Sequence, residues 1–141
     1  MKRLIVTGDD FGASVAVNEA IEAAHKQGIL NTTSLMVGAQ ASGDAVRRAR
    51  EMPSLGVGLH LVLVNGRPVL PPSQISGLVG DDGIFSTRLV LSGIRFFFLP
   101  AVRRQMAAEI RAQFELFHET GLALDHVNAH MHMHMHPTVM G

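Results

Sequence analysis

The residues best suited to chemistry lie in one segment near residue 130, where histidine recurs at almost every second position. Residues 125–137 read Asp-His-Val-Asn-Ala-His-Met-His-Met-His-Met-His-Pro, and Asn128 takes the one slot in the alternation that lacks a histidine. Alternation at period two predicts an extended strand, with His126, Asn128 and the later histidines on one face and the methionines on the other. Neutral imidazole is the commonest metal ligand in proteins, so this face is a candidate metal site.

The histidine segment is also compatible with three roles outside an enzyme's metal site. It could be a low-complexity metal-binding tract, the remnant of an expression tag, or a strand whose core histidines are hydrogen-bonded. A tag is usually a homopolymer at a terminus, whereas this segment alternates and is followed by Pro137. The histidine segment therefore needs support from other parts of the chain.

A pair of adjacent carboxylates, Asp9 and Asp10, follows a short apolar run at the start of the chain. Two adjacent carboxylates repel each other, and a divalent cation would relieve this repulsion while leaving one carboxylate free as a base. Neighbouring residues of a strand point to opposite faces, so both can serve one site only where the backbone turns. We expect Phe11-Gly12 to supply that turn. The alternative is a pair that caps a helix or forms a turn.

A single histidine, His60, lies inside the apolar segment 55–63. On its own it is more typical of a hydrogen-bonded core histidine than of a metal ligand. Its place late in a predicted strand nevertheless matches the places of Asp9-Asp10 and of His130.

The composition limits the possible functions. A chain of 141 residues has the length of one domain, and its 12 basic and 12 acidic side chains give no overall field to attract nucleic acid or an anionic membrane. The absence of cysteine excludes disulfides and thiolate zinc sites, so a metal would be held by histidine and carboxylate. The N-terminal apolar run is too short for a signal peptide, and no segment reads as transmembrane. We therefore expect a cytoplasmic protein.

Apolar segments with strand character alternate with amphipathic segments of helical period. Strands are predicted at residues 3–8, 32–37, 55–63 and from 122 onward, and helices at 14–28, 42–51, 89–99 and 100–121. This alternation predicts an α/β fold with about four parallel strands. Active sites of such sheets gather at the C-terminal ends of the strands, where Asp9-Asp10, His60 and His130 are expected.

Two further segments stand out from this pattern. Residues 65–83 form a long excursion rich in turn residues, and long loops in compact α/β domains are often functional. Residues 96–98 are three consecutive phenylalanines, which favour a place in the core. The second interpretation of this cluster is a hydrophobic rim for a partner or a lipid-bearing substrate.

Taken in order, these motifs resemble the YdjC-like carbohydrate deacetylases, and among them the branch associated with hopanoid biosynthesis. The resemblance extends along the whole chain and rests on an ordered series of short motifs: Asp9-Asp10-Phe11-Gly12-x-Ser14 with Asn18 and Ile21, Thr33-Ser34-Leu35-Met36, Gly58-Leu59-His60-Leu61, Asn65-Gly66-Arg67-Pro68 and Asn128-Ala129-His130-x-His132-x-His134. Where many members of the family have an aspartate in the last motif, this chain has Asn128.

The resemblance implies a function and a set of site residues. The reaction would be removal of an acetyl group from an N-acetylated sugar or glycolipid, with one divalent metal ion, Mg²⁺ or Zn²⁺, as cofactor. The ligands would be Asp10, His60 and His130, and Asp9 would be the catalytic base. His132 or His134 would orient a ligand, hold the tetrahedral intermediate or donate a proton.

The resemblance also implies a partial (β/α) barrel of the YdjC/NodB type, for which an open doubly wound sheet is the alternative. Members of the family are roughly twice as long, so we expect residues 1–141 to be a single α/β domain that forms the N-terminal part of a longer deacetylase barrel. An open sheet exposes an unpaired edge, so the chain is expected to form a homo-oligomer or to need the missing C-terminal half.

Two competing functions remain. One is another metal-dependent amidohydrolase or phosphoesterase, which could also carry a His-x-His motif on a barrel strand. The other is a metal-binding module without enzymatic activity, in which the histidine segment binds the metal alone.

Overall fold

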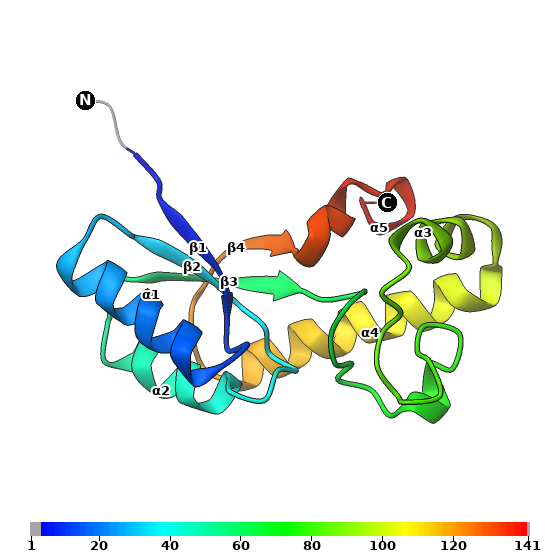
Figure 1. The fold of residues 1–141 in the computed structure, drawn as a ribbon, viewed down its shortest axis with the longest axis horizontal. Coiled ribbons are helices and arrows are strands. Elements are labelled where there is room, and N and C mark those ends of the chain that lie inside the picture. The colour runs from blue at the N-terminus through cyan, green and yellow to red at the C-terminus, as the bar shows by residue number, and fades with distance from the viewer. Residues whose placement is uncertain (1–3, 141) are drawn as a thin grey trace.

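Four short strands form one parallel sheet in the computed structural model, which describes residues 4–140 (Figure 1). Their bounds are Thr7–Phe11 (β1), Thr32–Leu35 (β2), Gly56–Leu61 (β3) and Leu124–Ala129 (β4), and their spatial order is β1-β2-β3-β4. All three pairings are parallel. The predicted α/β fold with four parallel strands is therefore confirmed.

Three helices connect consecutive strands and lie together on one side of the sheet in Figure 1. They are Val15–Gln27 (α1), Ser42–Arg50 (α2) and Pro100–Glu119 (α4). Ser14 caps α1 as predicted, because its hydroxyl accepts a hydrogen bond from the Val17 amide. Right-handed connections between strands in sequential order place every helix on the same face, as in a (β/α) barrel and unlike a doubly wound sheet. The sheet is open, since β1 and β4 do not pair in the part of the chain that the structure describes.

The remaining elements lie beyond the C-terminal ends of the strands, at the end of the molecule opposite the N-terminus (Figure 1). They are two 3-10 turns, Pro72–Gln74 (η1) and His130–Met135 (η2), and two helices, Leu89–Phe98 (α3) and Pro137–Met140 (α5). Within the described residues, no helix is both long and apolar enough to cross a bilayer.

Two hydrophobic clusters hold the molecule together. One fills the space between the sheet and helices α1 and α2 and includes the fully buried Phe11, Leu35 and Leu59. The other joins the ends of the strands to the excursion, α3 and α4, and includes Val64 and Phe85. The excursion is therefore a packed part of the fold that shares a core with the sheet.

Helix α4 also ties the excursion down through a buried carboxylate. Glu109 has no exposed surface, and its two oxygens accept hydrogen bonds from the amides of Val69 and Leu70. Gln113, one turn further along α4, donates to the carbonyl of Val62 and accepts from its amide. These bonds fix the chain where it leaves β3.

The sheet is strongly curled, so that its outermost strands face each other. In a flat sheet β1 and β4 would be three strand spacings apart, about 14 Å. Instead the Asn128 side-chain amide of β4 donates to the Asp9 carboxylate of β1 over 2.8 Å. Such curvature is what closure into a barrel requires, and it brings polar side chains of all four strands onto one concave face.

Several predicted boundaries differ from the structure. The first strand begins at Thr7 instead of residue 3 and continues through Asp9 and Asp10 to Phe11, while Arg3 lies outside the described residues. The second and third strands end at Leu35 and Leu61, earlier than predicted. The predicted strands were longer because the residues that follow β2 and β3 are also apolar. In the structure these residues pack into the two hydrophobic clusters and make no strand pairing.

The prediction that the histidine segment continues as a strand to residue 136 is wrong. Strand β4 ends at Ala129, which pairs with the last residue of β3, Leu61, so no ladder is available further along. Met131 and His132 then adopt left-handed backbone angles, with φ of 53° and 57°. The chain turns there and buries Met133. The later histidines therefore do not share a strand face with His130.

The prediction of a buried phenylalanine cluster holds for one of its three members. Phe96 is 2% exposed, whereas Phe97 and Phe98 are 50% and 68% exposed. The three are consecutive in a helix, and a helix turns neighbouring side chains about 100° apart, so one packed face cannot take them all.

The two unpaired strand edges lead to a testable expectation. Leu124 and Val127 of β4 are 47% and 45% exposed, and an exposed apolar edge strand favours association. We expect the chain to have a mass above that of a monomer in light scattering, and Val127→Lys to shift it toward monomer. Val15→Lys, at a 50% exposed position of α1, is the control. A wild-type chain that is monomeric and melts cooperatively would contradict this.

Candidate metal centre

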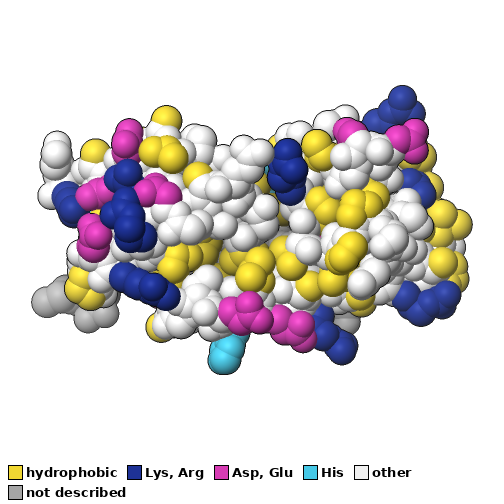
Figure 2. Space-filling view, turned by 90° about the horizontal axis from the view of Figure 1, so that it is seen from below, with side chains coloured by type: hydrophobic (Ala, Val, Ile, Leu, Met, Phe, Trp, Pro, Cys, Tyr) yellow, Lys and Arg dark blue, Asp and Glu magenta, His cyan; other side chains and the backbone are white. Residues whose placement is uncertain are grey.

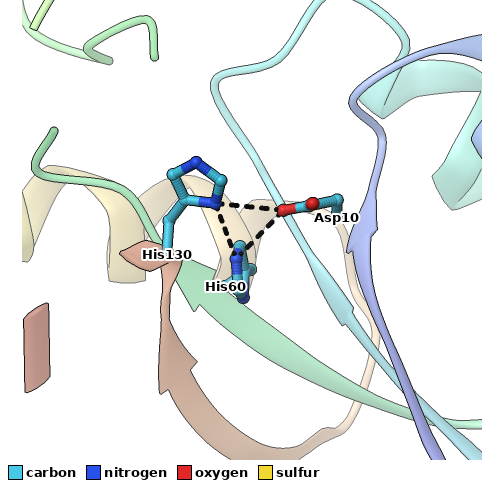
Figure 3. A group of neighbouring side chains, drawn as sticks. All are labelled: Asp10, His60 and His130. Atoms are coloured by element: carbon cyan, nitrogen blue, oxygen red, sulfur yellow. Dashed lines mark hydrogen bonds and ion pairs between the residues drawn. The ribbon is translucent and has the colours of Figure 1, made fainter. Parts of the chain in front are cut away.

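Three side chains from three strand ends meet at one point (Figure 3). The Asp10 Oδ1 atom lies 3.1 Å from His60 Nε2 and 3.1 Å from His130 Nδ1. The two histidine nitrogens are 3.3 Å apart. Asp10 comes from β1, His60 from β3, and His130 directly follows β4. The structure thus brings together the three residues that the family resemblance implied as ligands, as a group that could hold a metal ion.

A bulge in β1 gives Asp10 its position. Between the pairs Gly8–Thr33 and Phe11–Leu35, β1 has one residue more than β2. Asp10 accommodates the extra residue by adopting a φ of 64°, a left-handed conformation that aspartate tolerates better than most residues. The bulge lets both Asp9 and Asp10 serve the same concave face. The backbone therefore turns at Asp10, inside the strand and one residue earlier than the turn predicted at Phe11-Gly12.

The loop that follows β1 is fixed by a buried asparagine of α1. Asn18 has no exposed surface, and its Oδ1 accepts a 2.7 Å hydrogen bond from the Gly12 amide. Its amide group donates to the Ala41 carbonyl and to the Asp44 carboxylate. Gly12 itself has a φ of 97°, and a Cβ there would lie 3.1 Å from the Met36 carbonyl oxygen. Asn18 and Gly12 together hold the carboxylate segment against the next loop.

The hydrogen bonds of His60 determine which of its nitrogens faces Asp10 without a proton. His60 is 3% exposed, and its Nδ1 lies 2.6 Å from Asn128 Oδ1 and 3.0 Å from Ser34 Oγ. An amide oxygen can only accept, so His60 Nδ1 carries the proton and donates it. In the neutral ring Nε2 is then an acceptor, and it faces the Asp10 oxygen. Two acceptors this close need a cation between them, either a proton or a metal ion.

Asp9 completes this network and fixes the orientation of the asparagine. Asn128 Nδ2 donates to Asp9 Oδ1 over 2.8 Å, and Ser34 Oγ donates to the same oxygen over 2.9 Å. Since the amide group of Asn128 is bound to a carboxylate, its oxygen must point to His60. The four strands are therefore joined by one hydrogen-bond chain that runs from Asp9 through Ser34 and Asn128 to His60.

The same contacts set the charge of Asp9. Burial by itself would raise the pKa of the Asp9 carboxyl, but the hydrogen bonds from Ser34 and Asn128 outweigh burial and lower this pKa below its ordinary value. The nearby His60 and His126 rings act in the same direction. Asp9 is therefore held as a carboxylate at neutral pH.

The donor set fits a small divalent ion. Ligands at the bond lengths typical of Zn²⁺ or Mg²⁺ lie roughly 2.9–3.5 Å from one another around the ion. The three observed separations, 3.1, 3.1 and 3.3 Å, fall inside this range. Metal-bound histidines usually donate their other ring N–H to a fixed acceptor, as His60 does to Asn128. The chemistry of the group, two imidazoles and one carboxylate, suits several divalent metals.

The later histidines lie apart from this group. Among the described residues, His132 and His134 make no hydrogen bond or ion pair with Asp10, His60 or His130. The His132 and His134 rings instead face each other edge to face, with centroids 6.0 Å apart. The Nδ1 atom of His134 is buried without a hydrogen-bond partner.

His136 has a structural role in the segment after β4. Its Nδ1 accepts from the Thr138 amide, so its Nε2 carries the proton and donates to the Gly93 carbonyl of α3 over 3.0 Å. Its ring also meets Phe96 edge to face. His136 thereby fastens the segment after β4 to α3.

Sequence reasoning missed the parts played by Ser34 and Asn128, which hold His60 and Asp9 in place. Both positions were visible as members of short motifs, and Asn128 shares the alternation of the histidine segment. Their contacts to Asp9 could not be foreseen, because they depend on the curl of the sheet.

Comparisons with known proteins agree with the fold and with the series of motifs. The family model described as "YdjC-like protein" matches residues 3–141. A carbohydrate deacetylase of Brevibacillus brevis is 38% identical over 138 residues, which cover 98% of this chain and 52% of that protein. A carbohydrate deacetylase of Geobacillus stearothermophilus is 38% identical over 136 residues, covering 96% of this chain and 51% of that protein.

A solved structure shows the same arrangement. It is that of a proposed cellobiose-phosphate cleavage protein from Enterococcus faecalis V583, with a TM-score of 0.83 and 29% identity. The match covers 97% of this chain and 52% of that one. The chain thus spans about half the length of the proteins it matches.

The hydrogen bond between His60 and Asn128 can be tested by metal titration. Asn128→Ala removes the acceptor that fixes the His60 ring, and loss of such a partner typically lowers metal affinity about 10–100-fold. Asn128→Asp keeps an acceptor oxygen and should retain more of the affinity than Asn128→Ala. Calorimetric titration with Zn²⁺ would measure both variants beside His118→Ala, at an exposed position of α4. Equal affinity of Asn128→Ala and wild type would contradict the role of Asn128.

Proposed function

Because the chain belongs to the YdjC-like family, we propose that it carries the metal-binding half of a carbohydrate deacetylase, which removes an acetyl group from an N-acetylated sugar. Two kinds of support favour this proposal. The relatives at 38% identity bear the name carbohydrate deacetylase. The site offers a possible metal-binding group, Asp10, His60 and His130, and an adjacent carboxylate, which are the groups that hydrolysis of an amide needs.

The observation that carries the proposal is the meeting of Asp10, His60 and His130 within 3.1–3.3 Å. In the proposal these residues hold one divalent ion, Zn²⁺ or Mg²⁺, and leave further coordination positions open. When bound, such an ion polarises a carbonyl and makes water more acidic. The geometry supports the assignment because three unrelated parts of the sequence present one donor atom each to one point.

Asp9 is the proposed catalytic base. Its Oδ1 accepts both hydrogen bonds, from Ser34 and from Asn128, which leaves Oδ2 to receive a proton from the attacking water. The lowered pKa of Asp9 keeps the carboxylate ionised, and so able to accept that proton, at neutral pH. In this proposal Oδ1 positions the carboxylate and Oδ2 accepts the proton.

His132 and His134 are the proposed groups for the substrate side of the reaction. They follow His130 within the turn η2 and do not belong to the group of Asp10, His60 and His130. His132 is exposed and free to contact a sugar, and His134 carries an unpaired buried nitrogen. Either imidazole could donate a proton to the leaving amine or a hydrogen bond to the tetrahedral intermediate.

The proposed substrate and assembly rest on the family resemblance. The resemblance to the hopanoid-biosynthesis branch makes an N-acetylated sugar carried on a hopanoid lipid the substrate to test first, and the cytoplasm the proposed location. We propose that the four strands form the first part of a longer barrel. The concave face would then be completed by the C-terminal half or by a second copy of the chain.

The role of Asp9 gives the test of the reaction. Asp9→Asn keeps the shape of the side chain but cannot take a proton, so acetate release from N-acetylglucosamine oligosaccharides should fall about 10²–10⁴-fold. Zn²⁺ affinity should stay within a few-fold of wild type, since Asp9 is not a proposed ligand and the amide oxygen of an asparagine can still accept from Asn128 and Ser34. Asp125→Asn, at an exposed carboxylate of β4, is the matched control. A wild-type chain that binds Zn²⁺ but releases no acetate would favour a metal-binding module or another hydrolase.

A further inference from the structure

Helix α3 presents most of its large apolar side chains to solvent. Large apolar residues recur at positions i, i+1, i+4, i+7 and i+8, which form one face of a helix. All five are exposed by 45% or more: Val90, Leu91, Ile94, Phe97 and Phe98. The opposite face, which packs on the protein, carries Ser92 and Phe96. The outward stripe is therefore a surface built for contact with something apolar.

Apolar exposure continues next to this stripe. Leu99, which follows α3, is 44% exposed, and Met135 and Met140 of the adjoining segment are 77% and 73% exposed. His136 joins that segment to α3. We call the stripe of five residues together with Leu99 the α3 face. Figure 2, seen from below, shows hydrophobic side chains at this end of the molecule with basic side chains beside them, which are arginines because the chain has no lysine after Lys26.

Basic side chains outnumber acidic ones around the α3 face. Residues 83–108 contain four arginines and no aspartate or glutamate, although the whole chain has a net charge of zero. Two of these arginines, Arg88 and Arg95, line one hollow with Leu91, and Asp82 is the acidic residue of that hollow. The other two, Arg103 and Arg104, are exposed on the first turns of α4. By contrast, Arg47 and Arg48 of α2 are paired with carboxylates.

We infer that the α3 face docks the protein onto the surface of an anionic bilayer. An exposed apolar helix face flanked by arginines is the pattern of a helix that lies in the interface, with its apolar side among the acyl chains and its cations at the headgroups. With ten residues, α3 is about 15 Å long, so it lies on the membrane and does not cross it.

The charge pattern favours an anionic bilayer over a second copy of the chain as the partner of the α3 face. A symmetric dimer would place the same patch of both copies face to face. The two copies would then bring the eight arginines of residues 83–108 to the same end of the dimer, with Asp82 of each copy as the acidic residue of the hollow. Anionic headgroups would instead neutralise these charges. The inference does not depend on the proposed reaction, because it concerns a surface outside the metal centre.

The absence of tryptophan from the chain provides a direct probe. Phe98→Trp places a single tryptophan in the α3 face, and Ile29→Trp places one at a 74% exposed position that follows α1. We expect phosphatidylcholine vesicles that contain phosphatidylglycerol to shift the fluorescence of Phe98→Trp to the blue and to leave Ile29→Trp unchanged. The shift should weaken in high salt and be small with pure phosphatidylcholine.

Substitutions then separate the apolar and the charged contributions in vesicle co-sedimentation. Each of Arg103→Gln and Arg104→Gln should lower the partition coefficient roughly fivefold, whereas Arg47→Gln in α2 should leave it unchanged. Phe97→Ser should weaken binding about tenfold or more. No shift for Phe98→Trp, or equal binding to neutral and anionic vesicles, would overturn the inference. So would an oligomer, seen by light scattering without vesicles, that Phe97→Ser converts to monomer while vesicle binding is absent.

Discussion

The hydrogen bond from His60 Nδ1 to Asn128 Oδ1 is the interaction on which the candidate site depends. It sets the tautomer of a buried imidazole, so that the free nitrogen faces the Asp10 carboxylate. It requires the amide of Asn128 to be oriented by Asp9, and that contact exists only because β1 and β4 face each other across a curled sheet. The curl of the sheet, the bulge at Asp10 and the polar concave face are thus parts of one constraint. A flat sheet with the same strands would leave the three donor atoms far apart.

Much of the fold and of the donor set could be predicted from the sequence. Strand and helix alternation predicted the parallel sheet, because apolar period and turn residues are local signals. Asp10, His60 and His130 could be named because each sits where a strand ends and because their motifs occur in the order typical of a known family. The prediction that failed also rested on a local sequence pattern. Period-two alternation predicted a strand through His136, but a strand needs a neighbour, and β3 ends opposite Ala129. The contacts of Ser34 and Asn128 depend on tertiary curvature, which no short pattern encodes.

The molecule has two regions with different tasks. The sheet with α1 and α2 supplies the carboxylate segment and its brace, Asn18. The excursion, α3 and α4 extend beyond the strand ends and carry the α3 face. The segment from His130 to His136 links the two regions, since its first residue belongs to the possible metal-binding group and its last is hydrogen-bonded to α3. The YdjC-like relatives are about twice as long as this chain.

A calorimetric titration of the chain with Zn²⁺, repeated on Asp10→Ala, His60→Ala and His130→Ala, tests whether three strand ends form one metal site. We expect one ion per chain and a loss of affinity of about 100-fold or more for each substitution, because each removes one of three ligands. His118→Ala should bind like wild type. If Asp10→Ala and His60→Ala keep the wild-type affinity, the histidine segment binds metal by itself. The convergence of three strands on one metal site would then be contradicted.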